Sequence, residues 1–217
     1  MTASLASFQS DLLRALQGEG ACPLDANSAG YRLTVKIRRS WCEGRVIVGS
    51  RRILWAIPEA NRQRLVNEYV DRGGGLEMFL HREAENFFRF LTPRLPDPSH
   101  ALTLCEMYLA VTRAQRGAMM VAESRHSTGT EVLRRGRYAS LVWFYADPDA
   151  VIAGLAGGHL PPVGAPKHAV LFAPRLPDFF RVATQDEVEL WDALPTALGP
   201  DTVTARLLRD GVIEYSD

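Results

Sequence analysis

Tyr138–Tyr145 reads Tyr-Ala-Ser-Leu-Val-Trp-Phe-Tyr, an uncharged segment dense in apolar and aromatic residues. This composition predicts a β-strand. Side chains alternate between the faces of a sheet, so Leu141 and Trp143 would share one face and Val142 and Phe144 the other. Neither face is polar. We therefore expect an interior strand, covered on both sides, at the point where a helical half meets a small sheet.

The chain after this strand mixes strands and helices. His168–Ala173 and Phe179–Ala183 predict two more strands, and the intervening Pro174–Pro177 is short enough for a hairpin. Thr184 and Glu187 have the spacing of a capping box, which predicts the start of a helix.

A further helix is expected between Asp201, as its N-cap, and Gly211, followed by a last strand at Val212–Tyr215. The order of three strands, two helices and a terminal strand resembles a winged-helix-like module spanning residues 138–217.

The chain before Tyr138 has helical periodicity. Tyr31–Ile57 has an ambiguous period. Gly44 and Gly49 are candidate breaks, and we favour two helices there, with an extended Arg45–Val48 as the alternative. The other predicted helices are an amphipathic one ending near Gly18–Gly20, one from Pro58 to Gly73–Gly75, one over Leu76–Leu91 and one from His100 to about Glu123.

The predicted fold class is therefore α+β. It comprises an N-terminal helical bundle in residues 1–123, a polar linker in 124–137 and a small α+β module in 138–217.

Composition and cysteine spacing predict a reduced, cytoplasmic protein. The apolar and charged fractions, 47% and 23%, are ordinary for a globular protein, and no run of residues has the length and hydrophobicity of a membrane span. Cys22, Cys42 and Cys105 form no Cys-x-x-Cys pair, and we expect Cys42 and Cys105 to be core residues.

The zero net charge hides a segregation. Residues 32–64 contain nine Lys or Arg and two Glu, whereas residues 178–217 contain nine Asp or Glu and three Arg. One basic and one acidic region in a neutral chain suit docking to partners more than binding to a long polyanion.

No catalytic residue and no metal site is predicted for this chain. Glu77, His81 and Glu85 recur every four residues, as ligands on a helix could, but they run away from the apolar stripe, so we expect a solvated face. A DNA-binding transcriptional regulator and a stand-alone enzyme remain alternatives. The acidic final helices carry the wrong sign for DNA, whereas a peptide added to the sheet edge needs no charge match.

Short patterns in both halves resemble one known family. They are Tyr31-Arg32, Ile57-Pro58, Phe87–Leu91, Cys105-Glu106, Ala169-Val-Leu-Phe172 and the segment from Asp186 to Leu194. These features resemble a helical family once described as putative DNA-binding, which includes the MbnC- and TglI-like partner subunits of TIM-barrel multinuclear iron oxidases. Those oxidases modify ribosomally made peptides.

The resemblance implies a non-catalytic role in natural-product biosynthesis. The helical half would dock on the iron oxidase as a heterodimer, and the C-terminal module, like a RiPP recognition element, would bind the leader of a cysteine-containing precursor peptide. Iron would belong to the partner enzyme, with no cofactor in this chain, and neither nucleic acid nor a membrane would be bound.

Two residue sets follow from this role. For docking on the enzyme we expect the basic residues Arg38, Arg39, Arg45, Arg51 and Arg52. For the peptide, the proline-flanked strands predict the open sheet edge, with the Tyr138–Tyr145 strand as scaffold. The expected peptide-binding residues are His168, Val170, Phe172, Phe179, Phe180, Arg181 and Val182.

Overall fold

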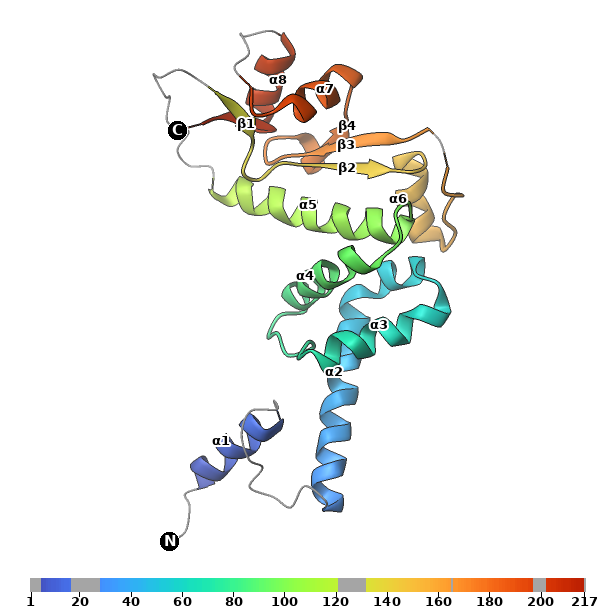
Figure 1. The fold of residues 1–217 in the computed structure, drawn as a ribbon, viewed down its shortest axis with the longest axis vertical. Coiled ribbons are helices and arrows are strands. Elements are labelled where there is room, and N and C mark those ends of the chain that lie inside the picture. Colours follow the sequence, from blue (N-terminus) through green and yellow to red (C-terminus); the bar gives the residue numbers. More distant parts are fainter. Residues whose placement is uncertain (1–4, 17–27, 121–131, 165, 197–201, 217) are drawn as a thin grey trace. The chain divides into compact units, whose positions relative to one another are not determined.

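The computed structural model describes residues 5–16, 28–120, 132–164, 166–196 and 202–216 of the chain (Figure 1). The structure combines helices with small antiparallel sheets, which confirms the predicted α+β class. Its contacts divide it into two compact units, Met1–Phe87 and Phe88–Asp217. The division falls within a helix, well before the segment 124–137 where the sequence analysis places a linker.

The first unit contains helices α1 (Leu5–Leu16), α2 (Ala29–Ala56), α3 (Glu59–Asp71) and most of α4 (Leu80–Leu91). The prediction of two helices in Tyr31–Ile57 is wrong, because α2 runs without a break through Gly44 and Gly49. A glycine costs a helix only about 1 kcal/mol. Packing of the buried face of α2, which includes Cys42, Val46 and Ile53, outweighs that cost.

The remaining helix boundaries of this unit follow local signals. The Ser28 side chain caps α2 by accepting a hydrogen bond from the Tyr31 N–H at 3.2 Å. Pro58 precedes α3, and the chain leaves α3 at Gly73–Gly75, as predicted. Gly73 and Gly75 have positive φ angles, which glycine adopts without strain.

The second unit contains one long helix, two small sheets and shorter helices. In chain order these are η1 (Thr92–Arg94), α5 (His100–Met120), β1 (Leu133–Arg135), β2 (Ser140–Phe144), α6 (Pro148–Gly157), β3 (His168–Phe172), η2 (Pro177–Phe179), β4 (Phe180–Val182), α7 (Gln185–Ala193), α8 (Thr202–Asp210) and β5 (Ile213–Tyr215).

The predicted strands exist, and the capping box is present at α7, where Glu187 accepts the Thr184 N–H at 2.9 Å. Part of the predicted linker is not a linker, because β1 lies within it and pairs with β5. Residues 124–131 of that segment, and the predicted cap Asp201, lie outside the described residues.

The main sheet has the order β2-β3-β4, with both pairs antiparallel. Strand β3 is therefore central, and β2 is an edge strand of this sheet. This overturns the expectation of an interior strand at Tyr138–Tyr145. Strand order depends on pairing between distant segments, which the composition of one segment does not encode.

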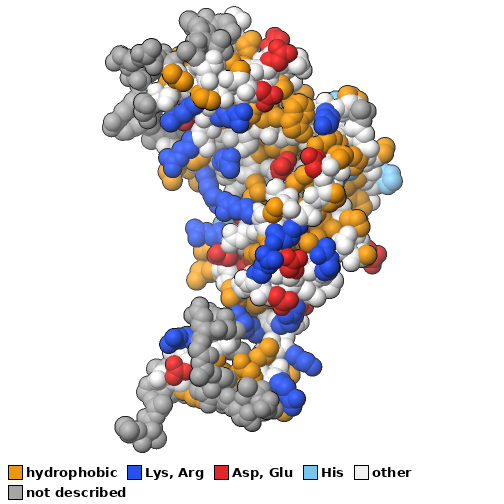
Figure 2. Space-filling view, viewed as in Figure 1, with side chains coloured by type: hydrophobic (Ala, Val, Ile, Leu, Met, Phe, Trp, Pro, Cys, Tyr) orange, Lys and Arg blue, Asp and Glu red, His pale blue; other side chains and the backbone are white. Residues whose placement is uncertain are grey.

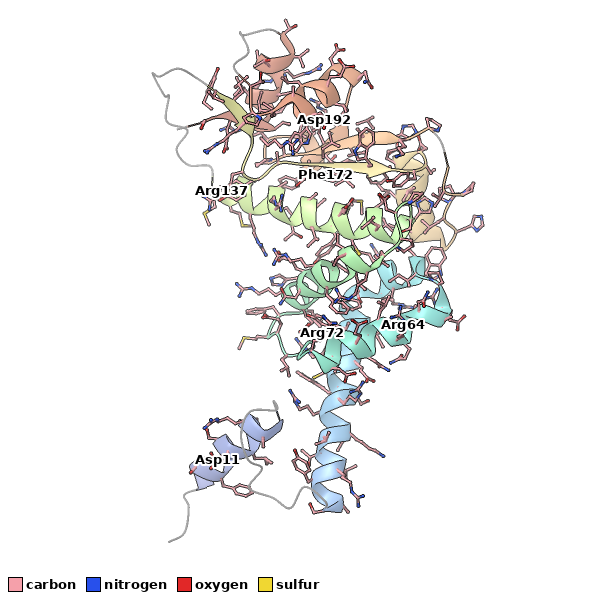
Figure 3. All side chains as sticks on the ribbon, viewed as in Figure 1. Asp11, Arg64, Arg72, Arg137, Phe172 and Asp192 are labelled. Atoms are coloured by element: carbon pink, nitrogen blue, oxygen red, sulfur yellow. The ribbon has the colours of Figure 1, made fainter. Side chains whose placement is uncertain are left out.

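Both faces of this sheet are nevertheless covered by helices, as expected (Figure 1). On one face, the Thr103 side chain of α5 donates to the Trp143 carbonyl of β2 at 3.0 Å, and Phe172 lies between the sheet and α5 (Figure 3). The other face packs against α7 and α8 in a core that includes Leu171, Trp191 and Leu207. The long helix α5 thus belongs to the sheet-containing unit.

Candidate functional site

The predicted open edge at His168–Ala173 is excluded by the sheet order. Strand β3 pairs with β2 on one side and with β4 on the other. Val170 and Phe172 are each only 1% exposed, so their side chains form the core of the sheet unit. An incoming peptide cannot pair with a strand that already has two neighbours, and the free edges of this sheet are β2 and β4.

Strand β4 directs part of its backbone off the sheet. The Ala173 N–H donates to the Phe179 carbonyl at 3.0 Å, and the Ala183 N–H donates to the Ala169 carbonyl at 2.8 Å. In an antiparallel ladder, every second residue bonds to the same neighbouring strand. The N–H and C=O groups of Arg181 therefore face β3, as the bonded groups of Phe179 and Ala183 do. The N–H and C=O groups of Phe180 and Val182 therefore point away from β3.

Two of these four groups bond to nearby parts of the chain. The Phe180 N–H bonds to Pro177 in the preceding turn, and the Arg181 side chain reaches the Val182 carbonyl at 3.4 Å. The Val182 side chain is 53% exposed. Phe180 is half-buried beside Phe172, with ring centroids 5.8 Å apart, and Phe179 has a positive φ of 68° in the turn.

Arg181, predicted to contact a peptide, instead anchors β4 to the helices behind it. Its guanidinium donates to both oxygens of Glu187, at 2.5 and 2.7 Å, and to Asp210 at 3.2 Å. Arg206 of α8 adds an ion pair to Glu187 at 2.9 Å. Glu187 is fully buried. The side chains of three elements thus meet at one buried carboxylate, so Arg181 holds the edge strand in place.

The electrostatics of Glu187 show how strong this anchor is. Burial favours the neutral acid, but the hydrogen bonds from Arg181 and the Thr184 N–H, with the charges of Arg181 and Arg206, outweigh it. The pKa of Glu187 is lowered to about 2. The carboxylate is therefore charged throughout the neutral range, as charge-assisted bonds require.

Strand β2 is the other edge, and other parts of the unit lie against it. The outward carbonyl of Trp143 accepts from Thr103, and the carbonyl of Tyr145 accepts from the Gly164 N–H at 2.7 Å. At the opposite end, the Ala139 N–H donates to Gly136 at 3.0 Å. An added strand would have to displace these partners, so β4 is the more accessible edge.

The basic residues predicted for partner docking do not share one surface. Arg39 is bonded to Glu43 and Asp71. Arg45 donates to the carbonyls of Glu77 and Met78. The helical period brings Arg38, Arg45 and Arg52 to one side of α2 and places Arg39 on another.

Two members of the predicted docking set, Arg51 and Arg52, are more accessible than Arg39 and Arg45. Arg51 and Arg52 are exposed and form no ion pair with any described residue. In the space-filling view, Lys and Arg side chains lie next to apolar ones in the first unit (Figure 2).

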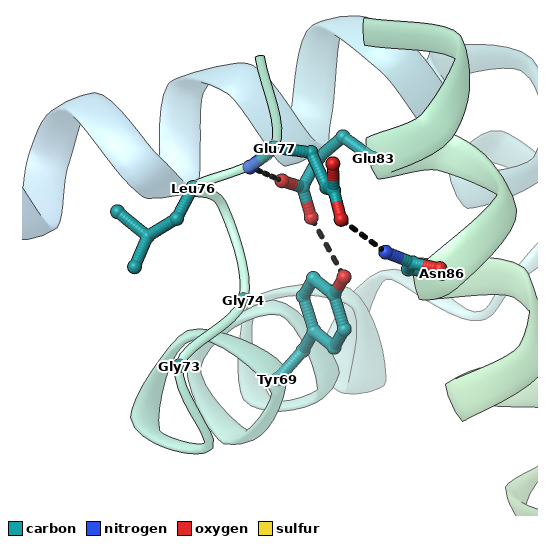
Figure 4. Close-up of a pocket in the computed structure, with 7 residues that line it drawn as sticks. All are labelled: Tyr69, Gly73, Gly74, Leu76, Glu77, Glu83 and Asn86. Carbon is teal, nitrogen blue, oxygen red and sulfur yellow. Dashed lines mark hydrogen bonds between the residues drawn. The ribbon is translucent and has the colours of Figure 1, made fainter. Parts of the chain in front are cut away.

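Glu83, a residue that sequence reasoning missed, lines a pocket of about 260 Å³ in the first unit (Figure 4). Glu83 is 1% exposed and accepts hydrogen bonds from the Tyr69 hydroxyl at 2.6 Å and from the N–H groups of Gly75 and Glu77 at 3.0 and 2.8 Å. Burial, and then the bond to Glu83, raises the pKa of Tyr69 above its usual range. Both oxygens are thus occupied, and Glu83 fixes the loop between α3 and α4.

The expectation of a solvated face for Glu77, His81 and Glu85 fails at Glu85, which is 4% exposed. Glu77 accepts from Asn86 at 3.1 Å, and His81 is exposed and stacks on Phe79 with ring centroids 5.7 Å apart. Within the described ranges, no group of three or more His, Cys, Asp or Glu side chains is arranged to hold a metal ion.

Cys42 and Cys105 are buried, as expected, and neither is disulfide-bonded. Burial raises the pKa of both thiols, that of Cys105 to about 12. A thiol with such a pKa is a poor nucleophile near neutral pH. Cys22 lies outside the described residues.

Comparison with protein-family models finds no match, and comparison with curated proteins finds none either. Among the helices that the structure describes, none has both the length and the hydrophobicity needed to cross a membrane.

Proposed function

We propose that this chain is a non-catalytic accessory subunit that binds the leader of a ribosomal precursor peptide along β4 and presents it to a multinuclear non-heme iron oxidase. The oxidase would bind the iron and oxidise a cysteine of the precursor. In this proposal the β2-β3-β4 sheet with α7 and α8 acts as a winged-helix-like recognition module. The sequence resemblance supports the choice of partner enzyme.

The observation that carries the peptide-binding part is the exposed edge of β4. The Val182 N–H and the Phe180 C=O point off the sheet next to a Val182 side chain that is 53% exposed. One donor and one acceptor flanking Arg181 match the two main-chain bonds that a single residue of a parallel added strand makes. An apolar peptide side chain on the same face would cover Val182 and Phe180.

The Arg181–Glu187 anchor supports this proposal because it holds the edge strand before a peptide arrives. A preformed edge avoids the cost of ordering the acceptor strand at the moment of binding. The described structure places two helices and an ion-pair network directly behind a strand of only three residues.

The test is to co-express the chain with an iron oxidase and a short cysteine-containing precursor encoded beside it. We expect the three to copurify, and the precursor leader to bind the purified chain in isothermal titration. Val182→Pro should weaken leader binding at least about tenfold, because it removes the outward N–H. Val182→Thr, which keeps that N–H, is the matched control. A chain that binds neither enzyme nor leader would refute the proposal.

A further inference from the structure

Helix α2 has a second apolar face, which points outward. Its inward face buries Cys42, Val46, Ser50, Ile53 and Leu54. On the outward side, five large apolar residues are exposed: Leu33 (58%), Ile37 (61%), Trp41 (54%), Val48 (66%) and Trp55 (38%). Isolated exposed apolar residues are ordinary, but several on one face of a helix mark an interaction surface.

The row has the spacing of a coiled-coil seam. Trp41, Val48 and Trp55 are seven residues apart. Ile37 lies four residues before Trp41, and Gly44 lies three residues after Trp41 and four before Val48. The remaining position of this four-and-three pattern is the exposed Arg51. A Cβ atom at Gly44 would meet no atom of the other described residues within 4 Å, so the position is open to a close approach by another helix. We call Ile37, Trp41, Gly44, Val48 and Trp55 the α2 seam. They have the arrangement into which the side chains of a second helix pack.

A row of arginines borders the seam. Arg38, Arg45 and Arg52 also recur every seven residues and lie beside Trp41 on the helical wheel. The guanidinium of Arg45 is 4.7 Å from the centre of the Trp41 ring, so the two rows are in contact. In a coiled coil, this flanking position faces charged residues of the partner helix.

Charge selects the occupant of the seam. In a parallel pair of two copies of α2, the arginine row would face Ser40 and Ile47, which carry no charge. In an antiparallel pair the arginines would face each other and repel. Helix α1 carries one acid, Asp11, and one base, Arg14, so it does not complement the row either.

Duplex DNA would attract the arginines by charge but would place Ile37, Val48 and the tryptophans against phosphates. A helix with an apolar stripe and acidic flanks matches both rows.

We propose that the α2 seam binds an acidic amphipathic helix of another protein. Apolar side chains of that helix would pack on the seam, and its carboxylates would pair with the arginine row. The inference rests on the proposed function and deepens it, because it names the chemistry of the element with which the partner enzyme docks. It relies on α2 alone and not on the sheet.

The test uses the full chain and two synthetic helical peptides of about four heptads. Both carry leucine at the seam-facing positions. One has glutamate on both flanks, which keeps it from self-pairing at neutral pH, and the other has lysine there. Fluorescence anisotropy should detect binding of the acidic peptide and at least about tenfold weaker binding of the basic one, with the acidic complex weakened by salt.

Variants then assign the binding to the seam. Val48→Glu should abolish acidic-peptide binding, and its 66% exposure means that folding is not at risk. Arg52→Glu should weaken binding of the acidic peptide and strengthen binding of the basic one. Arg64→Glu, at an exposed position of α3, is the matched control and should leave the binding of both peptides unchanged.

Equal binding of the two peptides, or of neither, overturns the inference. So does a dimer in light scattering that Val48→Glu dissolves, which would make a second copy the occupant. Duplex DNA that competes with the acidic peptide would overturn it in favour of nucleic acid. Leader binding along β4 is measured separately, so loss of one interaction with retention of the other shows which proposal has failed.

Discussion

The two edges of the β2-β3-β4 sheet differ in what lies against them. Along β2, the outward groups of Ala139, Trp143 and Tyr145 are bonded to other parts of the same unit. Along β4, the outward Phe180 N–H bonds to the preceding turn, and the outward Val182 carbonyl accepts from the Arg181 side chain. Whether an edge is free therefore depends on what packs against it and not on its composition, since the more apolar strand is the covered one.

The largest loss of stability should come from removing Glu187, the carboxylate that anchors Arg181 of β4. Glu187→Ala leaves Arg181 and Arg206 without their shared carboxylate. We expect a loss of about 3–5 kcal/mol in the free energy of unfolding, the range for breaking a buried ion pair. Urea unfolding measures it. Glu189→Ala, which removes an exposed neighbour bonded to Gln185, should cost almost nothing, and equal losses would contradict the role of Glu187.

Proline substitutions should separate bonded from free strand positions. Val142→Pro removes an N–H that faces β3 and should cost about 3 kcal/mol or more. Val182→Pro removes an N–H that points off the sheet and should cost about 1 kcal/mol or less. Thermal unfolding of both variants measures the difference. Comparable losses of stability would mean that the Val182 N–H faces β3 and does not point off the sheet.

Acidification should weaken the β4 anchor within a defined range. The folded-state pKa of Glu187, about 2, lies below its unfolded value. Its contribution, about 3 kcal/mol, is therefore complete above the unfolded pKa near 4.5 and is lost as pH falls toward 2. Urea unfolding between about pH 5 and pH 2 should show this loss, and Glu187→Gln should flatten the profile. An unchanged profile in that variant would assign the loss to other carboxylates.

The smallest effect concerns the covered edge. Thr103→Val keeps the shape of a side chain that is 1% exposed but removes its bond to the Trp143 carbonyl. We expect a loss of about 1 kcal/mol and faster hydrogen exchange along β2. Thr112→Val, on a half-buried position of the same helix, is the control. A Thr103 variant that leaves both quantities unchanged would show that this bond does not protect the edge.

Local signals predicted the elements well. The capping box at Thr184, the glycine exit at Gly73–Gly75 and the proline-flanked strands β3 and β4 all act within a few residues. Pairing acts over a distance. Strand β1 has three residues and exists because it pairs with β5, about eighty positions later, and the sheet order likewise joins segments that are far apart.

The site residues were harder to predict for the same reason. The sequence predicts Arg181 as a peptide contact, but its partners come from α7 and α8. Glu83 lies in a charged run and resembles its neighbours. Its three hydrogen-bond donors nevertheless come from Tyr69 and from the N–H groups of Gly75 and Glu77, between α3 and α4. A sequence shows that a carboxylate is present, whereas its burial depends on which elements pack around it.

Hydrogen exchange of the backbone amides, with and without the precursor leader, tests the central claim most directly. If the leader adds to β4, the Val182 amide becomes protected on binding while those of Leu141 and Trp143 in β2 keep their exchange rates. Protection at Leu141 and Trp143 with none at Val182 would contradict the account and move the binding edge to β2.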